Sequence, residues 1–150
     1  TTHPRLFCLN EQRTGKTGSI VWASDFMMRE RDVKRVLIVC TMSCMRPVWE
    51  SEIFGITPNR SVAILHGSAA KRRELLAQDY DYYVINHDGI KVIRKELVEA
   101  LKSGRIDLLV VDEISEFGDS RTDRYEVLYE MSKVAKRIWG LTGTPMSKGP

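Results

Sequence analysis

The chain has 150 residues, 43% of them hydrophobic and 29% charged, which is the composition of an ordinary globular domain with a core of its own. No apolar run approaches the roughly 18 residues of a membrane span, and no signal-peptide pattern opens the chain, so we expect no membrane partner and a cytoplasmic protein, or a nuclear one in a eukaryote. The formal net charge of +3 permits a polyanionic partner without requiring one.

Short apolar runs recur along the chain. Most consist of consecutive apolar residues rather than alternating apolar and polar ones, which is typical of strands buried on both faces. The runs cover residues 6–9, 36–40, 62–65, 82–86, 106–111 and 138–141. Helical patterns separate them, and three sets of residues are each expected to share a helix face: Ile20, Ala23 and Met27; Ile90, Ile93, Leu97 and Leu101; and Tyr125, Leu128, Ser132 and Ala135. Shorter helices are expected at residues 47–52 and after Ser68.

The alternation of strands and helices indicates βαβ units, and therefore an α/β fold with a mostly parallel central sheet and helices on both faces. No linker, repeat or low-complexity stretch divides the chain, so residues 1–150 are expected to form a single domain. The abrupt ends read as those of a piece of a longer protein. In open parallel sheets ligands bind beyond the carboxyl ends of the strands, so the residues that directly follow each strand carry the functional information.

A phosphate-binding loop is predicted between the first expected strand and the helix that follows it. Gly15 allows a tight turn, and the amides at the helix start attract an anion together with the helix dipole. Lys16 is placed to reach terminal phosphates, and the Thr17 hydroxyl to bind Mg²⁺. Asn10 stands near the position where the full pattern has a glycine, and a surface turn with an exposed lysine is the alternative. The expected nucleotide-binding residues are Gln12, Arg13, Thr14, Gly15, Lys16, Thr17 and Gly18.

An acidic pair, Asp112 and Glu113, ends the buried run of residues 106–111. Burying a charge is costly unless something pairs with it, and here the carboxylates fall at the expected ligand edge of the sheet. Asp112 is placed to hold Mg²⁺ and Glu113 to act as the general base that polarises the attacking water. Considered without the phosphate loop, the pair could equally cap the next helix.

The last expected strand ends in small hydroxyl residues around a glycine, at Thr142, Gly143 and Thr144. Such short donors suit the sensing of a neighbouring carboxylate or phosphate, and the glycine permits close backbone approach. We expect these three residues to couple the nucleotide-binding site to the rest of the protein. Without the preceding strand, the same residues would read only as a turn.

Two further features leave their meaning open. The cluster Lys71-Arg72-Arg73 is either a solvated helix face or a patch for a polyanion. The three cysteines argue against a disulfide scaffold and favour a reducing compartment, and Cys40 and Cys44 lack the further ligands that a zinc site requires.

Four blocks in this order resemble the first RecA-like domain of superfamily-two helicases, and look closest to the Swi/Snf-like branch and its phage or bacterial relatives. The blocks are Gly15-Lys16-Thr17, residues 36–40 followed by Trp49-Glu50-Ser51-Glu52-Ile53, residues 110–113, and residues 141–145. The resemblance implies a RecA-like P-loop fold and a motor that binds ATP with Mg²⁺ in a cleft between two such domains. The expected partner is DNA, duplex DNA in particular, with RNA as the alternative. The second RecA-like domain is absent from this chain, so we expect the isolated domain to turn over ATP very slowly.

The resemblance also implies contacts with a nucleic-acid backbone from the loops after three of the strands. On this sequence those residues are Thr41, Ser43, Gly67, Asn86 and His87, with Arg46 as a plausible addition. Such contacts use hydroxyls, amides and positive charges and carry no sequence readout. His87 could equally be a loop histidine without a partner.

Some residues depart from the family pattern. Ser115 stands where relatives have histidine or aspartate, which weakens the expected coupling, and no adenine-reading glutamine is evident upstream of the phosphate loop. One alternative is a different P-loop enzyme, but the arginine-rich lid of a kinase and the base-reading Asn-Lys-x-Asp of a GTPase are both missing. Another alternative is a degenerate P-loop domain that docks nucleic acid or protein without turnover.

Overall fold

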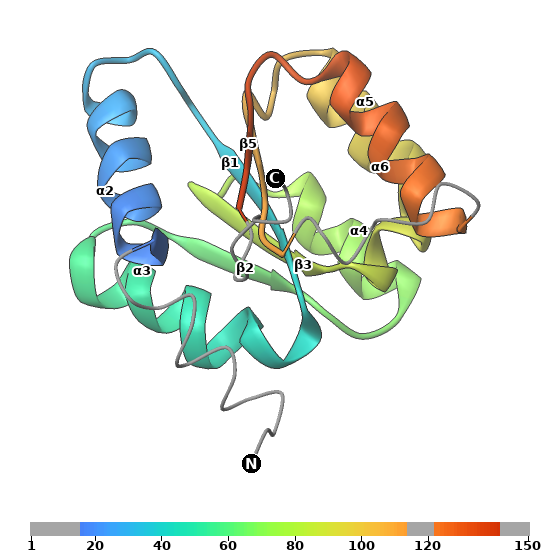
Figure 1. Ribbon diagram of the computed structural model, residues 1–150, viewed down its shortest axis with the longest axis horizontal. Helices are drawn as coiled ribbons and strands as arrows, with labels where there is room; N and C mark the ends of the chain where they lie inside the picture. Colours follow the sequence, from blue (N-terminus) through green and yellow to red (C-terminus); the bar gives the residue numbers. More distant parts are fainter. Residues whose placement is uncertain (1–15, 114–121, 142–150) are drawn as a thin grey trace, which may run out of the picture.

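A five-stranded parallel sheet forms the centre of the domain, and its strands lie in the order β2-β3-β1-β4-β5 (Figure 1). The computed structural model describes residues 16–113 and 122–141. The strands are β1 (Val36–Cys40), β2 (Val62–Leu65), β3 (Tyr82–Asn86), β4 (Leu108–Val111) and β5 (Ile138–Gly140). All four strand pairs are parallel, which confirms the α/β fold class expected from the sequence.

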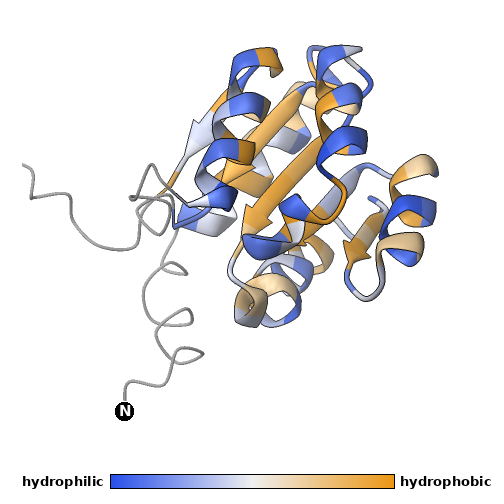
Figure 2. Ribbon diagram, turned by 90° about the vertical axis from the view of Figure 1, so that its right-hand side faces the viewer, coloured by the Kyte–Doolittle hydropathy of each residue, from blue (hydrophilic) through white to orange (hydrophobic). Residues whose placement is uncertain are grey.

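Helices cover both faces of this sheet. One face carries α2 (Lys16–Arg29), the π-helix η3 (Met45–Glu50) and α3 (Ser51–Ile56), and the other carries α4 (Ala69–Ala77), α5 (Arg94–Lys102) and α6 (Asp123–Val134). Two 3₁₀ turns, η2 (Met42–Cys44) and η4 (Asp88–Lys91), lead out of β1 and β3. Figure 2 shows apolar strands between helices whose outer sides are hydrophilic.

The central strands alternate between the two cores. In β1, Leu37 and Val39 belong to the core under α4, α5 and α6, whereas Val36, Ile38 and Cys40 belong to the core under α2 and α3. Burial of every β1 residue explains why this strand reads as a continuous apolar run rather than an alternating one.

The helix after Lys16 forms as expected, but the predicted face is wrong. The buried residues of α2 are Thr17, Val21, Ser24 and Met28, instead of Ile20, Ala23 and Met27. Two of the buried residues carry hydroxyls, so a hydropathy pattern does not find them. The Ser24 hydroxyl compensates its burial by a hydrogen bond of 2.7 Å with the Tyr82 hydroxyl.

Residues 47–52 do not form the simple helix that Pro47 suggested. Pro47 instead lies inside the π-helix η3, in which the amide of Ser51 donates to the carbonyl of Arg46, five residues earlier. Proline has no amide hydrogen and crowds the carbonyl four residues before it, so a wider turn accommodates it.

The cysteines differ from one another. Cys40 is a free thiol at the end of β1, and burial, with a smaller effect of Asp112, raises the pKa of this thiol well above its usual value. Cys44 is disulfide-bonded, which the cysteine count did not predict. In the described part of the chain, the helices are too short or too polar to cross a bilayer.

Asp107 supports a prediction about stability. Its buried carboxylate accepts hydrogen bonds from the amides of Lys34, at 2.8 Å, and Arg35, at 3.1 Å, and so ties the approach to β1 to the approach to β4. We expect Asp107→Ala to lower the free energy of unfolding by about 2–3 kcal/mol, because two backbone donors lose a charged acceptor. Urea denaturation measures this.

The control is Asp79→Ala, which removes the exposed ion pair of Asp79 with Arg35 at 3.1 Å. We expect this change to cost less than about 1 kcal/mol. Equal losses in the two variants would show that the Asp107 carboxylate does not hold the strands together.

Candidate functional site

The carboxyl ends of all five strands meet at one edge of the sheet, because every pair is parallel. Thr41, His87 and Asp112 directly follow β1, β3 and β4, the three central strands. The same edge receives the start of α2, since the positive charge of Lys16 acts on the Asp112 carboxylate. Lys16 and Asp112, both predicted as site residues from the sequence, are therefore close enough for their charges to interact.

Asp112 is enclosed by the central strands and by the segment after β1. Its residue is 1% exposed, and its amide donates to the carbonyl of Val39 at 2.7 Å. The carboxylate oxygen Oδ2 accepts from the indole Nε1 of Trp49 at 2.9 Å. The backbone carbonyl of Asp112 accepts from the His87 ring nitrogen Nε2 at 2.9 Å.

Two buried side-chain oxygens in the described residues have no hydrogen-bond partner, Asp112 Oδ1 and Thr17 Oγ1. Thr17 is 0% exposed at the start of α2. Buried polar atoms are normally satisfied, and one that is left unpaired costs about 1–3 kcal/mol. These two residues are the pair that the sequence predicts as Mg²⁺ ligands, and oxygen is the ligand type that Mg²⁺ prefers.

The residues present therefore fit a magnesium ion. The described residues contain no group of three or more histidine, cysteine, aspartate or glutamate side chains that could hold a metal. Two protein oxygens are as many as Mg²⁺ commonly takes from a protein, since it usually keeps waters and takes further ligands from substrate phosphates.

The charge of Asp112 is poorly compensated. Burial raises the pKa of this carboxyl above its ordinary value, and the Trp49 indole, the Glu113 backbone amide and the charge of Lys16 each act in the opposite direction. Burial is the largest of these effects, so the described residues do not supply enough counter-charge for the ionised form.

Glu113 adopts a backbone conformation that is uncommon for its residue type. Its φ is +56°, in the left-handed region, and the residue is buried. A non-glycine residue held there costs about 1–3 kcal/mol, and such residues cluster at functional sites. The turn bends the chain directly after Asp112, where the sequence predicts the general base.

The predicted nucleic-acid contacts fall into two groups. Thr41 and Ser43 are half-buried, whereas Gly67 is exposed with a φ of +105°. Arg46 is exposed on η3 and pairs with Glu50 at 3.1 Å. These four residues lie in the segments that follow β1 and β2, at the edge where the acids lie.

Asn86 and His87 do not belong with them, because the two residues are buried, at 5% and 3% exposed. Asn86 Oδ1 accepts from Arg72 Nη1 at 3.2 Å, and His87 bonds to the backbone of Asp112. The expectation that these side chains contact a nucleic-acid backbone is therefore not supported. Their polar atoms connect parts of the protein to one another.

Arg72 is a residue that sequence reasoning missed. It is buried within the basic cluster 71–73, so that cluster is neither wholly solvated nor wholly a surface patch. Its guanidinium donates to the carbonyl of Gly67 at 3.0 Å as well as to Asn86, and burial lowers its pKa. Gly89 provides the space, since a Cβ there would lie 2.1 Å from Arg72 Nη1. Arg72 thus fastens the loop after β2 to the end of β3.

The remaining predicted residues lie outside the described residues. They are Gln12, Arg13, Thr14 and Gly15 of the phosphate loop and Thr142, Gly143 and Thr144 of the coupling block. Gly18, which is described, lies in α2, and a Cβ there would be 3.4 Å from Glu52 Oε1 on α3.

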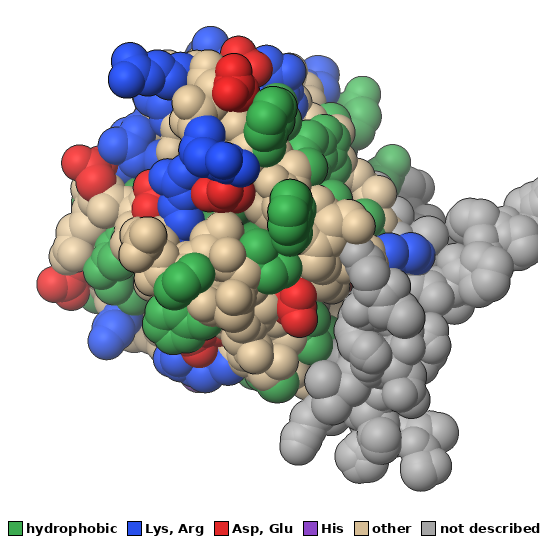
Figure 3. Space-filling view, turned by 90° about the vertical axis from the view of Figure 1, so that its left-hand side faces the viewer, with side chains coloured by type: hydrophobic (Ala, Val, Ile, Leu, Met, Phe, Trp, Pro, Cys, Tyr) green, Lys and Arg blue, Asp and Glu red, His purple; other side chains and the backbone are tan. Residues whose placement is uncertain are grey.

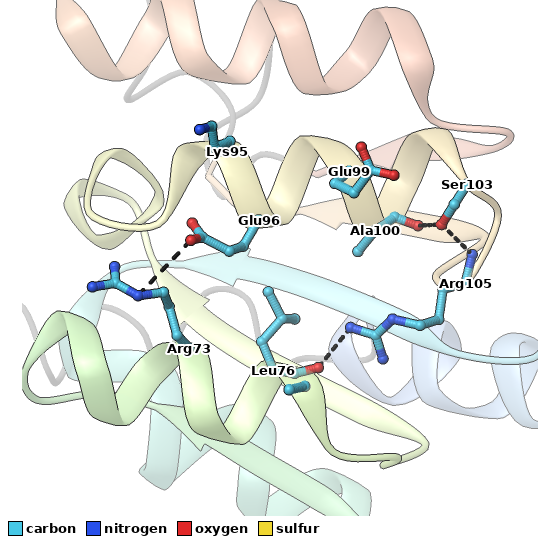
Figure 4. Close-up of a pocket in the computed structure, with 9 residues that line it drawn as sticks. Arg73, Leu76, Lys95, Glu96, Glu99, Ala100, Ser103 and Arg105 are labelled. Atoms are coloured by element: carbon cyan, nitrogen blue, oxygen red, sulfur yellow. Dashed lines mark hydrogen bonds and ion pairs between the residues drawn. The ribbon is translucent and has the colours of Figure 1, made fainter.

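Other surface features lie away from the acids. A cavity of about 560 Å³ opens between α4 and α5, where Arg73 faces Glu96 at 3.8 Å and Arg105 donates to the carbonyl of Leu76 at 2.6 Å (Figure 4). On the opposite face of the sheet, Trp22, Phe26 and Phe54 are exposed on α2 and α3, and Figure 3 shows hydrophobic side chains gathered on this side. None of these residues is a predicted site residue.

Comparison with known proteins places the chain. A family model described as SNF2-related domain matches residues 8–150. A search of curated proteins returns no significant match. Among solved structures, the Sulfolobus solfataricus SWI2/SNF2 ATPase core in complex with dsDNA matches with a TM-score of 0.71 and 22% identity, over 91% of this chain and 27% of that one. This chain therefore spans about a quarter of that structure, and the match supports the RecA-like fold.

The buried charge of Asp112 gives a prediction for protein free of metal and nucleotide. An acid whose pKa is raised in the folded state lowers the stability of the fold as the pH rises. The loss begins near the ordinary pKa of the acid, about 4, and is complete above its raised pKa in the folded state. Asp112→Asn removes the charge, so we expect the variant to be more stable than the wild type at pH 7. The gain should be about 1.4 kcal/mol for each unit of the shift.

Urea denaturation of both proteins between pH 4 and pH 8 measures the difference. The advantage of the variant should grow with pH and should disappear below pH 4, where both side chains are neutral. A difference that does not change with pH would mean that the Asp112 carboxylate is compensated within the protein.

Proposed function

We propose, because this chain belongs to the SNF2-related domain family, that it is the ATP-binding RecA-like domain of a motor that hydrolyses ATP with Mg²⁺ and moves along DNA. Family and fold together make it an ATPase or helicase-type domain. The observation that carries the finer proposal is the pair of unpartnered buried oxygens, Thr17 Oγ1 and Asp112 Oδ1, beside Lys16.

The start of α2 supports phosphate binding. Helix amides that lack an acceptor point outward at an amino terminus, and the helix dipole adds attraction for an anion. Lys16 is exposed at this end, and its ammonium group would hold the terminal phosphates of ATP.

Thr17 and Asp112 would hold the metal. Thr17 would contribute its hydroxyl and Asp112 its oxygen Oδ1, the two atoms that find no partner among the described residues. Magnesium, when bound, neutralises charge on the phosphates and on the transferring phosphoryl group. The cation would in turn supply the counter-charge that the Asp112 carboxylate lacks.

Glu113 would act as the general base. Its carboxylate would accept a proton from the water that attacks the terminal phosphate, while the left-handed turn fixes the backbone at this point. The hydrogen bond from His87 to the carbonyl of Asp112 holds the same peptide. The orientation of Glu113 is thereby supported from the end of β3.

DNA is the proposed partner, and duplex DNA is preferred to RNA. The matched Sulfolobus structure contains dsDNA. On this chain Thr41, Ser43, Arg46 and Gly67 would contact the phosphate backbone, without sequence readout. We further propose that a second RecA-like domain of the full-length protein closes the nucleotide cleft, as this chain spans about a quarter of the matched structure.

Two variants of the full-length protein separate binding from turnover. Lys16→Ala should abolish ATP binding, because the charge that holds the terminal phosphates is lost. Glu113→Gln should keep ATP bound and slow hydrolysis by about 10²–10⁴-fold, as expected for the loss of a general base. Binding of a fluorescent ATP analogue and steady-state phosphate release measure the two effects.

The matched control is Lys102→Ala, which removes an exposed lysine at the end of α5 on the other face of the sheet. Normal ATP binding by the Lys16 variant would remove the phosphate-site assignment. Normal turnover by the Glu113 variant would leave only a structural role for that residue.

Duplex DNA should raise the ATPase rate of the full-length protein, and Arg46→Ala should weaken this response. Each lost phosphate contact lowers the slope of log affinity against log salt by about one, so the variant should also bind DNA with a shallower salt dependence. DNA titrations at several salt concentrations measure both effects.

Glu50→Ala is the control, because it breaks the same ion pair with Arg46 at 3.1 Å and leaves the arginine in place. It should preserve or strengthen DNA binding. An ATPase that responds to neither DNA nor RNA would favour a different P-loop enzyme, and absence of turnover would favour a docking module.

A further inference from the structure

Trp49 makes the only side-chain hydrogen bond that the structure describes for the carboxylate of Asp112. Its indole Nε1 donates to Oδ2 at 2.9 Å, and both groups are buried. We propose that Trp49 is a positioning residue, which turns the Asp112 carboxylate so that Oδ1 alone is presented to the cation. This inference rests on the proposed magnesium site.

The chemistry of the indole suits this task. An indole nitrogen is a donor only, with one hydrogen and no lone pair to offer as an acceptor, and it carries no charge. It can therefore saturate one carboxylate oxygen without competing for the cation or repelling it. The two oxygens of Asp112 differ accordingly, since Oδ2 has a partner whereas Oδ1 has none among the described residues.

The fold holds Trp49 firmly. The residue is 0% exposed and belongs to the core under α2 together with Ile38 and Val110, on the strands β1 and β4. A ring fixed on this core cannot follow the carboxylate if it rotates, so the hydrogen bond sets the rotation of the carboxylate. A metal ligand positioned by a fixed partner loses less freedom when the cation binds.

The π-helix places the indole. Ser51 donates to the carbonyl of Arg46 across the wide turn, and within that turn both Val48 and Trp49 are buried. In this way the segment that follows β1 delivers a donor to the acid that follows the neighbouring strand β4. π-bulges are frequent at functional sites, and here the turn places the Trp49 indole beside the Asp112 carboxylate.

A purely structural role is the competing explanation, because a buried tryptophan also fills a large volume of core. The two roles differ in what the N–H group does. Packing depends on the volume and shape of the ring, whereas positioning depends on the single donor that faces Asp112. A change that removes the donor and keeps an aromatic ring separates them.

The experiment measures Mg²⁺ affinity in the full-length protein with Trp49→Phe. A fluorescent, non-hydrolysable ATP analogue is titrated with Mg²⁺, and its affinity is also measured in EDTA. We expect the Mg²⁺ concentration at half-saturation to rise about 10-fold, which is the usual size of the effect when a partner of a metal ligand is lost. The affinity in EDTA should remain within about 2-fold of the wild type.

Tyr82→Phe is the matched control. It removes a buried hydrogen bond of 2.7 Å, between Tyr82 and Ser24, in the same core and away from Asp112. This variant should leave the Mg²⁺ midpoint unchanged. Equal midpoints for Trp49→Phe and Tyr82→Phe would overturn the proposal and leave Trp49 a packing residue.

Two safeguards keep the outcomes distinct. If Trp49→Phe does not fold, replacement of Trp49 by benzothienylalanine removes the N–H and keeps the shape of the indole, and the same 10-fold shift is expected; an unchanged midpoint would overturn the proposal. If the wild type itself shows no Mg²⁺-dependent nucleotide binding, the proposed function fails, and the inference about Trp49 fails with it.

Discussion

A carboxylate withdrawn from water requires compensation, and Asp112 receives only part of it from the described residues. One of its oxygens bonds to the Trp49 indole and the other has no partner among the described residues. An unpaired charge in the interior is among the most costly features that a protein can carry. The surrounding structure tolerates it at the carboxyl edge of a parallel sheet, beside the start of α2, where a cation and its phosphate ligands would complete the balance of charge.

The three central strands are joined at this edge by hydrogen bonds to backbone carbonyls. Asp112 donates to Val39, the amide of His87 donates to Cys40 at 2.8 Å, and the His87 ring bonds to the carbonyl of Asp112. Asn86, the preceding residue, is held by Arg72, which also holds Gly67. A continuous set of contacts therefore runs from the loop after β2 to the peptide between the two acids.

Much of this could be predicted from the sequence, for an identifiable reason. Strands buried on both faces are continuous apolar runs, so β1, β2 and β3 were located to the residue, and Asp112 was found because it ends such a run. The hydropathy pattern does not find the buried face of α2, because Thr17 and Ser24 are polar. The burial of Ser24 depends on Tyr82, a partner far away in the chain. The same is true of Asn86 and His87, which looked like loop residues until Arg72 and Asp112 supplied their partners. Trp49 lies in one of the sequence blocks that resemble the helicases, but its proposed role follows only from the hydrogen bond between its indole and the Asp112 carboxylate.

The free thiol of Cys40 has a consequence for anyone who works with this protein. It lies at the end of β1, fully enclosed, and it stays protonated because burial raises its pKa. A thiol in that state is inert until the surrounding structure opens, so the rate at which a small alkylating reagent consumes it reports on local opening. Mass spectrometry of the alkylated protein therefore measures how often the core beside Asp112 opens, with no reporter residue engineered into the chain.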